Sequence, residues 1–294
     1  MRTPAQLVDD LVAARRVVER LRLPLGAQAW KGQAGEFRGA GVGSSIDFQD
    51  HRDYAPGDDP RHINWQAFAR TGQYSMKLYR EEVRPVIDLL VDVSQSMWAE
   101  PEKAQRTTEL LYFFTLSAQR SGASLQVHFL NGDASRPVSL EAIWSDRWVE
   151  EIELLSPTSA TAPPQLVEVR TRANAIRILL SDLLFEGDPA PFLRPLYDRQ
   201  GTGLVFAPFT QAEADPGWSG QYDFVDAEEG TRHPHQIGAG VLERYQEAYG
   251  RHFSLWNESC RRHRVVLARV AAGGELFSSL NHEAVRLGAL EVMP

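Results

Sequence analysis

The chain has 294 residues, of which 43% are hydrophobic and 24% are charged, a composition typical of one large or two smaller globular domains. Its 39 acidic residues outnumber its 31 lysines and arginines, and the resulting net charge of −8 argues against a general nucleic-acid-binding protein. The single cysteine, Cys260, excludes an internal disulfide framework. Because no apolar run approaches the ~20 residues that span a bilayer, and the N-terminus lacks the apolar core of a signal peptide, we expect a soluble cytoplasmic protein.

The first predicted element is a helix that begins after Thr3. Thr3 is a good N-cap, Pro4 suits the first helical position, and Gln6 completes a capping box. The apolar residues that follow share one helical face: Leu7, Leu11, Ala14, Val18 and Leu21. Pro24 and Gly26 end the helix. We expect it to pack on its own domain, and binding of a partner protein is the alternative.

Residues 32–84 show little helix or strand periodicity until a strand of alternating polarity begins near residue 74. The glycine-rich stretch 32–45 predicts a turned surface loop, because the strand and the Gly-Lys-Ser/Thr that a phosphate-binding loop needs are missing. A structural ion-pair network is expected among Arg52, Asp53, Asp58, Asp59 and Arg61. Since residues 46–84 have little apolar content, we expect residues 1–84 to pack on the rest of the chain rather than fold alone.

The rest of the chain is organised around residues 86–93, an apolar and β-branched run that predicts a buried strand. This strand ends in Asp92, which Ser94 and Ser96 follow in a loop. Open α/β sheets place their binding sites in such loops, at the carboxyl ends of strands. Oxygen atoms are the ligands that Mg²⁺ prefers. The alternative is that Asp92 or Ser94 only caps the next helix.

Beyond this loop, strand and helix patterns alternate to the C-terminus. Helices are expected at 102–120, 141–155, 164–172, 192–198, 240–262 and 275–288. Strands are expected at 124–130, 137–140, 175–181, 203–208 and 264–270, with a hairpin of 222–226 and 231–236. This alternation predicts an α/β fold with a mostly parallel sheet covered by helices on both faces.

The Asp-x-Ser-x-Ser sequence at Asp92 resembles the first motif of the metal-ion-dependent adhesion site of von Willebrand factor A domains. The resemblance implies two further ligands, a threonine from a turn before a helix and an aspartate after the next strand. The implied ligands of Mg²⁺ or Mn²⁺ are Asp92, Ser94, Ser96, Thr161 and Asp182. Thr158 is an alternative to Thr161 as the ligand from this turn. A helix N-cap would explain Thr161 equally well.

A longer motif upstream is similar to the signature of domain-of-unknown-function family 58, which couples that signature to a von Willebrand A-like domain. It reads Asp47-Phe48, Arg52-x-Tyr54-x-x-Gly57-Asp58-Asp59-x-Arg61-x-Ile63-x-Trp65 and Ala69-Arg70-Thr71-Gly72. Asn64 replaces the usual aspartate, which argues against a role that needs a charge there. The resemblance implies an N-terminal helix and signature segment in residues 1–84 and a von Willebrand A-like, Rossmann-like domain in residues 85–294.

The resemblance also implies a function. Such proteins are associated with AAA+ ATPases of the MoxR type, so this chain would be a chaperone adaptor that grips a partner carboxylate through the metal. We expect binding and no enzymatic turnover, because the motif supplies no general base. Alternatives are a metal-dependent phosphatase or hydrolase with Asp92 as nucleophile, and a scaffold whose metal site has decayed. Ser94, where the haloacid-dehalogenase type of phosphatase has a second aspartate, argues against the former. We expect the Asp92 carboxylate to be exposed.

Three other features have structural explanations as well as functional ones. Met97 and Trp98 follow the motif and either form a rim that contacts a partner or pack as helix residues. His233 and His235 share one face of the predicted hairpin, where a solvated face is favoured over a metal site. Cys260 shares a helix face with Trp256, which predicts core packing.

Overall fold

The computed structural model describes residues 2–27, 37–42, 48–56, 58–159, 163–228 and 230–293. Its contacts divide the chain into two compact units. The first unit comprises Met1–Pro24, Val86–Ser121 and Leu125–Pro294, and the second comprises Leu25–Pro85 with Gly122–Ser124. The main stretch of the second unit ends at Pro85, and the N-terminal helix belongs to the first unit, with the sheet that begins at Val86.

The first unit is built on a six-stranded sheet in the order β12-β9-β8-β5-β6-β7. The strands are β5 (Val86–Asp92), β6 (Ser124–Asn131), β7 (Ala134–Val138), β8 (Ile176–Leu180), β9 (Thr202–Phe209) and β12 (Val266–Ala271). Parallel pairing joins β12 to β9, β9 to β8 and β8 to β5, and β7 at the edge is antiparallel to β6. This is the mostly parallel α/β sheet that the sequence predicts.

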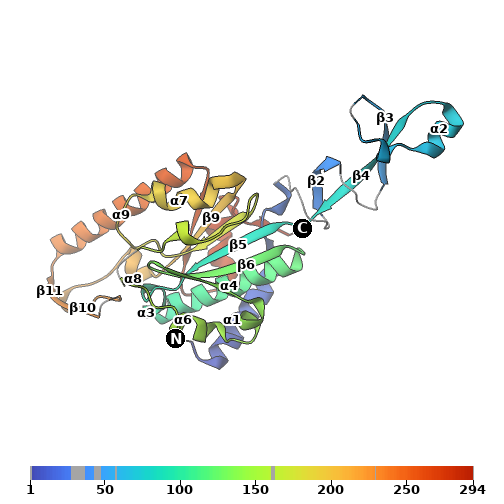
Figure 1. Ribbon diagram of the computed structural model, residues 1–294. Coiled ribbons are helices and arrows are strands. Elements are labelled where there is room, and N and C mark those ends of the chain that lie inside the picture. The colour runs from blue at the N-terminus through green and yellow to red at the C-terminus, as the bar shows by residue number, and fades with distance from the viewer. Residues whose placement is uncertain are drawn as a thin grey trace. The chain divides into compact units, whose positions relative to one another are not determined.

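Helices cover both faces of this sheet (Figure 1), and the side chains of β9 pack against helices on each face. On one face lie α7 (Pro189–Tyr197) and α9 (Ala239–Arg262), where Val205 and Ala207 of β9 join Leu193 and Trp256 in one buried cluster. The next side chain along, Phe206, points to the opposite face and meets Phe114 of α4 (Pro101–Arg120) with ring centroids 4.6 Å apart. Alternate side chains of a strand point to opposite faces, so both layers of the core are anchored on one strand.

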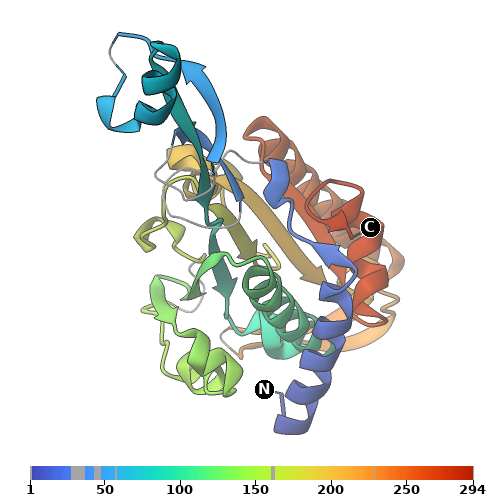
Figure 2. The ribbon, with the colours of Figure 1, turned by 90° about the vertical axis from the view of Figure 1, so that its right-hand side faces the viewer.

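The N-terminal helix α1 (Pro4–Val18) begins as predicted, with a complete capping box between Thr3 and Gln6. It packs against α4, and Figure 2 shows the two helices side by side. Its buried face includes Leu7, Ala14 and Val17. After α1, the short strand β1 (Leu21–Arg22) pairs with β13 (Glu291–Val292), so the two ends of the chain meet in one small sheet.

The second unit is a three-stranded sheet in the order β2-β4-β3 with one helix. Its elements are β2 (Phe37–Val42), β3 (Phe48–Asp53), α2 (Trp65–Thr71) and β4 (Ser75–Val83). The prediction of a loop over 32–45 is thus wrong for 37–42, because antiparallel pairing with β4 overrides the glycine content of this stretch. The remaining glycines of that stretch lie outside the described residues.

Charged and polar side chains fix the second unit locally. Arg52 pairs with Asp58 at 2.6 Å, and Arg61 pairs with Asp59 at 2.6 Å, so both pairs join residues within the signature segment. The Asn64 side chain caps α2 by accepting the amide of Ala67 at 3.1 Å. An amide oxygen caps a helix as a carboxylate does, which explains why the motif tolerates this departure.

Two other elements differ from the predictions. The expected helix 141–155 is split into α5 (Leu140–Trp144) and α6 (Trp148–Glu153). Asp146 between them has a φ of 59° and accepts a hydrogen bond of 2.7 Å from the hydroxyl of Tyr112, so a tertiary contact stabilises the break. The expected helix 164–172 is reduced to one 3₁₀ turn, Leu166–Glu168.

Candidate metal centre

The predicted site lies where the sheet changes direction. The chain passes from β5 to β6 on one side and later returns to β8 on the other, so the carboxyl ends of β5 and β8 flank the switch point of the sheet. Asp92 is the last residue of β5, and Asp182 follows β8 by two residues. Both line one pocket of about 480 Å³, together with Ser94 and Ser96. The fold thus brings four of the five predicted ligands together.

Asp92 is buried, with 1% of its surface exposed, so the expectation of an exposed carboxylate is wrong. One carboxylate oxygen, Oδ1, accepts the amide of Ser94 at 3.0 Å, and Oδ2 accepts the hydroxyl of Ser181 at 2.7 Å. Burial and the neighbouring Asp182 carboxylate raise the pKa of Asp92 to about 7, against the lowering effect of these hydrogen bonds. A buried carboxylate in this state would gain from a cation beside it.

The two serine hydroxyls of the motif lie side by side. Ser94 Oγ and Ser96 Oγ are 3.2 Å apart, and both side chains are half-buried. Two oxygens that bind Mg²⁺ at right angles, each about 2.1 Å from the ion, lie about 3.0 Å apart. The spacing of the hydroxyls therefore fits adjacent positions of an octahedral magnesium site.

Asp182 already has a cationic partner inside the protein. Its Oδ2 accepts a hydrogen bond of 2.9 Å from the ammonium of Lys103, which also pairs with Glu213. Burial favours the neutral amine, but the Asp182 and Glu213 carboxylates together outweigh it and raise the pKa of Lys103. Asp182 would therefore contribute to a metal site while it shares its charge with Lys103, an interaction that no sequence pattern predicts.

The backbone after β8 is held in an unusual conformation. Leu183 has a φ of 60° although it is fully buried, and bulky residues rarely adopt this left-handed conformation. Its amide donates to Ser181 Oγ at 3.2 Å, and its carbonyl oxygen contacts His252 Nε2 at 2.8 Å. Strained backbone of this kind is concentrated at functional sites, which supports a functional role for the loop that carries Asp182.

Thr158, the alternative ligand from the third predicted loop, does not lie at the site. Its backbone amide donates to Asp133 Oδ1 at 2.7 Å, a hydroxyl bond from Thr158 helps to lower the pKa of Asp133, and Thr158 does not line the pocket. Thr161 lies outside the described residues. Within the described part of the chain no three His, Cys, Asp or Glu residues gather as a metal-binding group. The donor set is instead two carboxylates and two hydroxyls, all oxygen atoms, which suits Mg²⁺ or Mn²⁺.

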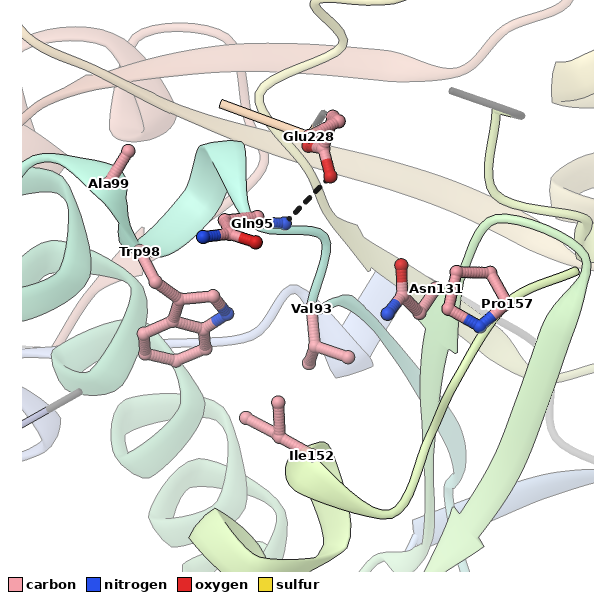
Figure 3. A pocket seen from close by; sticks show the side chains of 8 residues that line it. All are labelled: Val93, Gln95, Trp98, Ala99, Asn131, Ile152, Pro157 and Glu228. Atoms are coloured by element: carbon pink, nitrogen blue, oxygen red, sulfur yellow. Dashed lines mark hydrogen bonds between the residues drawn. The ribbon is translucent and has the colours of Figure 1, made fainter. Parts of the chain in front are cut away.

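A second pocket of about 340 Å³ borders the motif, and Figure 3 shows the side chains that line it. Trp98 is one of them and lies 5.9 Å from the ring of Trp148, whereas Met97 is fully buried. The Met97 sulfur lies 3.2 Å from the amide nitrogen of Asp182. Met97 therefore packs beneath the site, and Trp98 forms part of its surroundings.

Glu228 is a pocket residue that sequence reasoning missed. It comes from the turn of the hairpin formed by β10 (Gly220–Val225) and β11 (Arg232–Ile237), and it lines both pockets. Its carboxylate accepts hydrogen bonds from the backbone amides of Gln95 and Ser96. The sequence indicated only a turn at this position, with no pattern that relates it to the motif.

The other residues singled out from the sequence lie outside this pocket. His233 and His235 are exposed on β11 and line a separate, mainly apolar pocket beside Trp218 and Tyr245. Cys260 is buried among core residues, and burial raises the pKa of its thiol to about 12. This environment makes Cys260 a packing residue, as predicted.

Comparisons with known proteins agree with the motif in the first part of the chain. The family model described as protein of unknown function DUF58 matches residues 50–253. The chain therefore belongs to this family. A comparison with curated protein sequences gives no match. No helix in the described ranges is long and apolar enough to cross a membrane.

Two solved structures resemble the chain weakly. One is an aerotolerance-related membrane protein from Bacteroides fragilis, crystallised with multiple mutations to serines, with 12% identity and a TM-score of 0.37. The other is the conserved hypothetical protein BatB from Bacteroides thetaiotaomicron, with 15% identity and a TM-score of 0.34. Each similarity covers 69% of this chain and 98% of the other. At these scores the similarity supports no inference about function.

Proposed function

We propose that this protein is a cation-dependent protein-interaction module that binds a carboxylate of its partner. The observation that carries this proposal is the convergence of Asp92, Ser94, Ser96 and Asp182 on one pocket at the switch point of the sheet. The raised pKa of Asp92 adds to it, because the pocket holds negative charge that a divalent cation would neutralise.

Mg²⁺ or Mn²⁺ at this position would supply a Lewis-acidic centre for an anionic oxygen of the partner. Two of the four candidate ligands are neutral, since Ser94 and Ser96 offer hydroxyl oxygens. Asp182 shares its charge with Lys103, which sits 2.9 Å away. The residues would therefore hold the cation without fully neutralising it, and a carboxylate of the partner would complete the charge balance. An amide of the same shape would gain less.

The hydrogen bonds of Asp92 and Asp182 favour partner binding over enzymatic turnover. Both oxygens of Asp92 accept hydrogen bonds from the protein, from Ser94 and Ser181, so neither is positioned as a free nucleophile. Asp182 is paired with Lys103, and a general base would need a free carboxylate or imidazole within reach of a water. We propose no enzymatic activity for this site.

The partner that we propose is an AAA+ ATPase of the MoxR type or a protein on which it acts, in the cytoplasm. Support for this comes from membership of the family together with the resemblance of the motif to metal-dependent adhesion sites. In this role the chain would be a chaperone adaptor, and the acidic residue on the partner would be the group that the site recognises.

Lys103 also favours a second candidate, a scaffold that uses no metal. Its buried ammonium lies between Asp182 and Glu213 and already supplies a positive charge at the site. In this case the pocket would be a structural remnant, and the protein would bind its partner through other surfaces.

Calorimetric titration with Mn²⁺ or Mg²⁺ separates the two candidates. We expect saturable binding to the natural protein and its loss in Asp92→Asn and in the double variant Ser94→Ala, Ser96→Ala. Asn is preferred to Ala at position 92, because its amide oxygen can still accept the Ser94 amide and its NH2 group can donate to the Ser181 hydroxyl oxygen. Ser159→Ala, in the exposed loop beside Thr158, is the control and should bind metal normally. Heats that are equal in all variants, or absent in the natural protein, would favour the scaffold.

The same variants test the partner in a pull-down with and without EDTA. Chelation should release the partner, and moderate added salt should matter less, because direct coordination is screened less than a surface ion pair. A complex that resists EDTA with undiminished affinity would contradict a metal-bridged contact.

A further inference from the structure

Glu228 places a carboxylate of the protein itself on the Asp92–Ser96 loop. Its Oε1 accepts the amide of Ser96 at 3.0 Å and its Oε2 accepts the amide of Gln95 at 3.2 Å, so both carboxylate oxygens are used. Figure 3 shows Glu228 next to Gln95, with the hydrogen bond between them as a dashed line. The two partners are 132 and 133 residues away in the chain, so this contact is tertiary rather than local.

The turn that carries Glu228 is closed by its own hydrogen bonds. Asp226 Oδ1 accepts the amide of Glu228 at 2.9 Å, and the Asp226 carbonyl oxygen accepts the amide of Gly230 at 2.9 Å. The amide of Asp226 donates to the carbonyl of Thr231 at 2.8 Å. These bonds fix the backbone of the turn and direct the side chain of Glu228 away from the hairpin.

The hairpin itself is held loosely. Strands β10 and β11 form a separate two-stranded sheet, and almost all of their residues are exposed. At its base Trp218 lies 5.0 Å from Phe224 and 5.2 Å from Tyr245 of α9, measured between ring centroids. An isolated two-stranded hairpin is at best marginally stable in water, so the contacts of Glu228 with the Asp92–Ser96 loop would help to hold its tip in place.

We propose that the β10–β11 hairpin is a lid over the Asp92–Ser96 loop, with Glu228 as a latch that occupies the place of a partner's carboxylate. This inference rests on the proposed function, since it identifies what a partner must displace. The pocket is already lined by Asp92, Asp182, Glu186 and Asp226, so the carboxylate of Glu228 adds to a negative charge that disfavours the entry of a partner's carboxylate.

Competition by a tethered group lowers the apparent affinity for any free ligand. If only a fraction of the molecules have the lid open, the apparent dissociation constant rises by the inverse of that fraction. Opening would also connect the two pockets, because Glu228 lines both of them. The latch would thereby restrict binding to partners that present both a carboxylate and enough further contact to displace the lid.

Two variants of Glu228 and one control test the latch. Glu228→Gln keeps the shape and removes the charge, and Glu228→Ala removes the group. Glu186→Gln removes one charge from the same pocket without touching the amides of the loop. Since Glu228 lies in a half-buried turn and Glu186 lines the same open pocket, all three variants should fold.

Amide hydrogen exchange in EDTA reports on the latch without any metal. We expect the amides of Gln95 and Ser96, and those of β10 and β11, to exchange at least about tenfold faster in both Glu228 variants. Glu186→Gln should exchange like the natural protein. Equal rates in all four proteins would overturn the assignment of Glu228 as a latch.

Titration with sodium acetate in the presence of Mg²⁺ tests the competition, using the amide resonances of Gln95 and Ser96. Glu228→Ala should bind acetate at least about ten times more tightly than the natural protein and the Glu186→Gln control. Equal acetate affinities would overturn the competition. A third outcome separates the two proposals. If Mg²⁺ produces no binding heat but amide exchange in EDTA is faster in the Glu228 variants, the proposed metal-dependent function is wrong, whereas the assignment of the hairpin as a lid still holds.

Discussion

At the scale of single residues, this protein concentrates unusual electrostatics at one end of β5 and β8. Asp92 is buried with a raised pKa, and the ammonium of Lys103 is inserted between two carboxylates. The sequence identified Asp92 and Asp182 from their positions after apolar strands. It gave no sign of Lys103, because a lysine within a helix is ordinarily a solvated residue, and only packing buries this one.

Lys103→Met tests how strongly this buried pair is coupled. Removal of the ammonium leaves Asp182 buried without its partner, so we expect the free energy of unfolding to fall by about 3–5 kcal/mol, measured by urea denaturation. Arg262→Ala is the matched control. Its pair with Glu258 is 68% and 61% exposed, so the loss should stay below about 1 kcal/mol. Similar small losses in both variants would show that Lys103 is not required by the buried carboxylates.

His128 on β6 gives the fold a dependence on pH. Burial lowers its pKa, with a raising effect of Asp88 and a lowering effect of Arg172. Because its folded pKa lies below the unfolded value of about 6.5, the unfolded chain binds the proton more readily. The stability that neutral His128 contributes is therefore complete above about pH 6.5 and is lost as the pH falls from there towards the folded pKa.

His128→Gln should flatten this dependence, because glutamine does not titrate. Urea unfolding of both proteins at about pH 7.5 and about pH 5.5 measures the effect, since the unperturbed pKa of histidine lies in this window. Asp92, whose pKa is raised to about 7, also titrates there, but it does so in both proteins and cancels in the comparison. The natural protein should lose more stability between the two pH values than the variant does. Identical losses would mean that other groups cause the pH dependence.

At the scale of elements, one close approach positions the helix α7 against the sheet. A Cβ added to Gly203 of β9 would lie 2.9 Å from Leu196 Cβ and 3.0 Å from Val265 Cγ2. Such contacts are shorter than packed carbon atoms allow, so α7 or β12 would have to shift. Glycine within a strand often marks a close approach of this kind.

Gly203→Ala should therefore destabilise the protein by about 1–3 kcal/mol, measured by denaturant unfolding. Gly250→Ala in α9 is the opposite case, because its new Cβ would have no neighbour within 4 Å. Alanine is favoured over glycine within helices by about 0.5–1 kcal/mol, so this variant should be more stable. The same substitution is thus expected to lower the free energy of unfolding at Gly203 and to raise it at Gly250. A Gly203→Ala variant that is more stable than the natural protein would contradict the close packing of Gly203 against α7.

At the scale of the whole molecule, the chain begins in one unit, builds a second and returns to the first. Residues Met1–Pro24 belong with the sheet that starts at Val86, while Leu25–Pro85 form a unit of their own. The helix α2 of the second unit has no buried residue, and Phe68 on it stacks on Tyr74, with ring centroids 4.4 Å apart.

A fragment of residues 1–84 should show no cooperative unfolding in scanning calorimetry. Its helix α1 would lack α4, on which it packs, and its remaining residues bury too little apolar surface to offset the loss of chain entropy. The full chain, heated under the same conditions, provides the reference transition. A sharp heat-absorption peak from the fragment would show that the second unit is an independent domain.

The sequence by itself determined the parts of this protein that depend on short stretches of chain. The apolar run 86–93 predicted a buried strand, and the residues after it predicted an oxygen-rich loop. The alternation of strands and helices predicted the mostly parallel sheet, and the sheet topology then explains why Asp92 and Asp182 meet. Hydrophobic periodicity and the alternation of strands with helices are properties of the chain pattern, so they can be recognised from the sequence, whereas the order of the strands in the sheet came from the structure.

Only the tertiary structure decided which groups surround those residues. Lys103 reaches Asp182 across 79 residues, and Glu228 reaches Ser96 across 132, and no local pattern encodes either contact. The burial that raises the pKa of Asp92 likewise arises from how β5 and β8 are covered by other elements. Such contacts depend on the packing of distant segments, and for this reason the charge balance and the access to the site appear only in the folded chain.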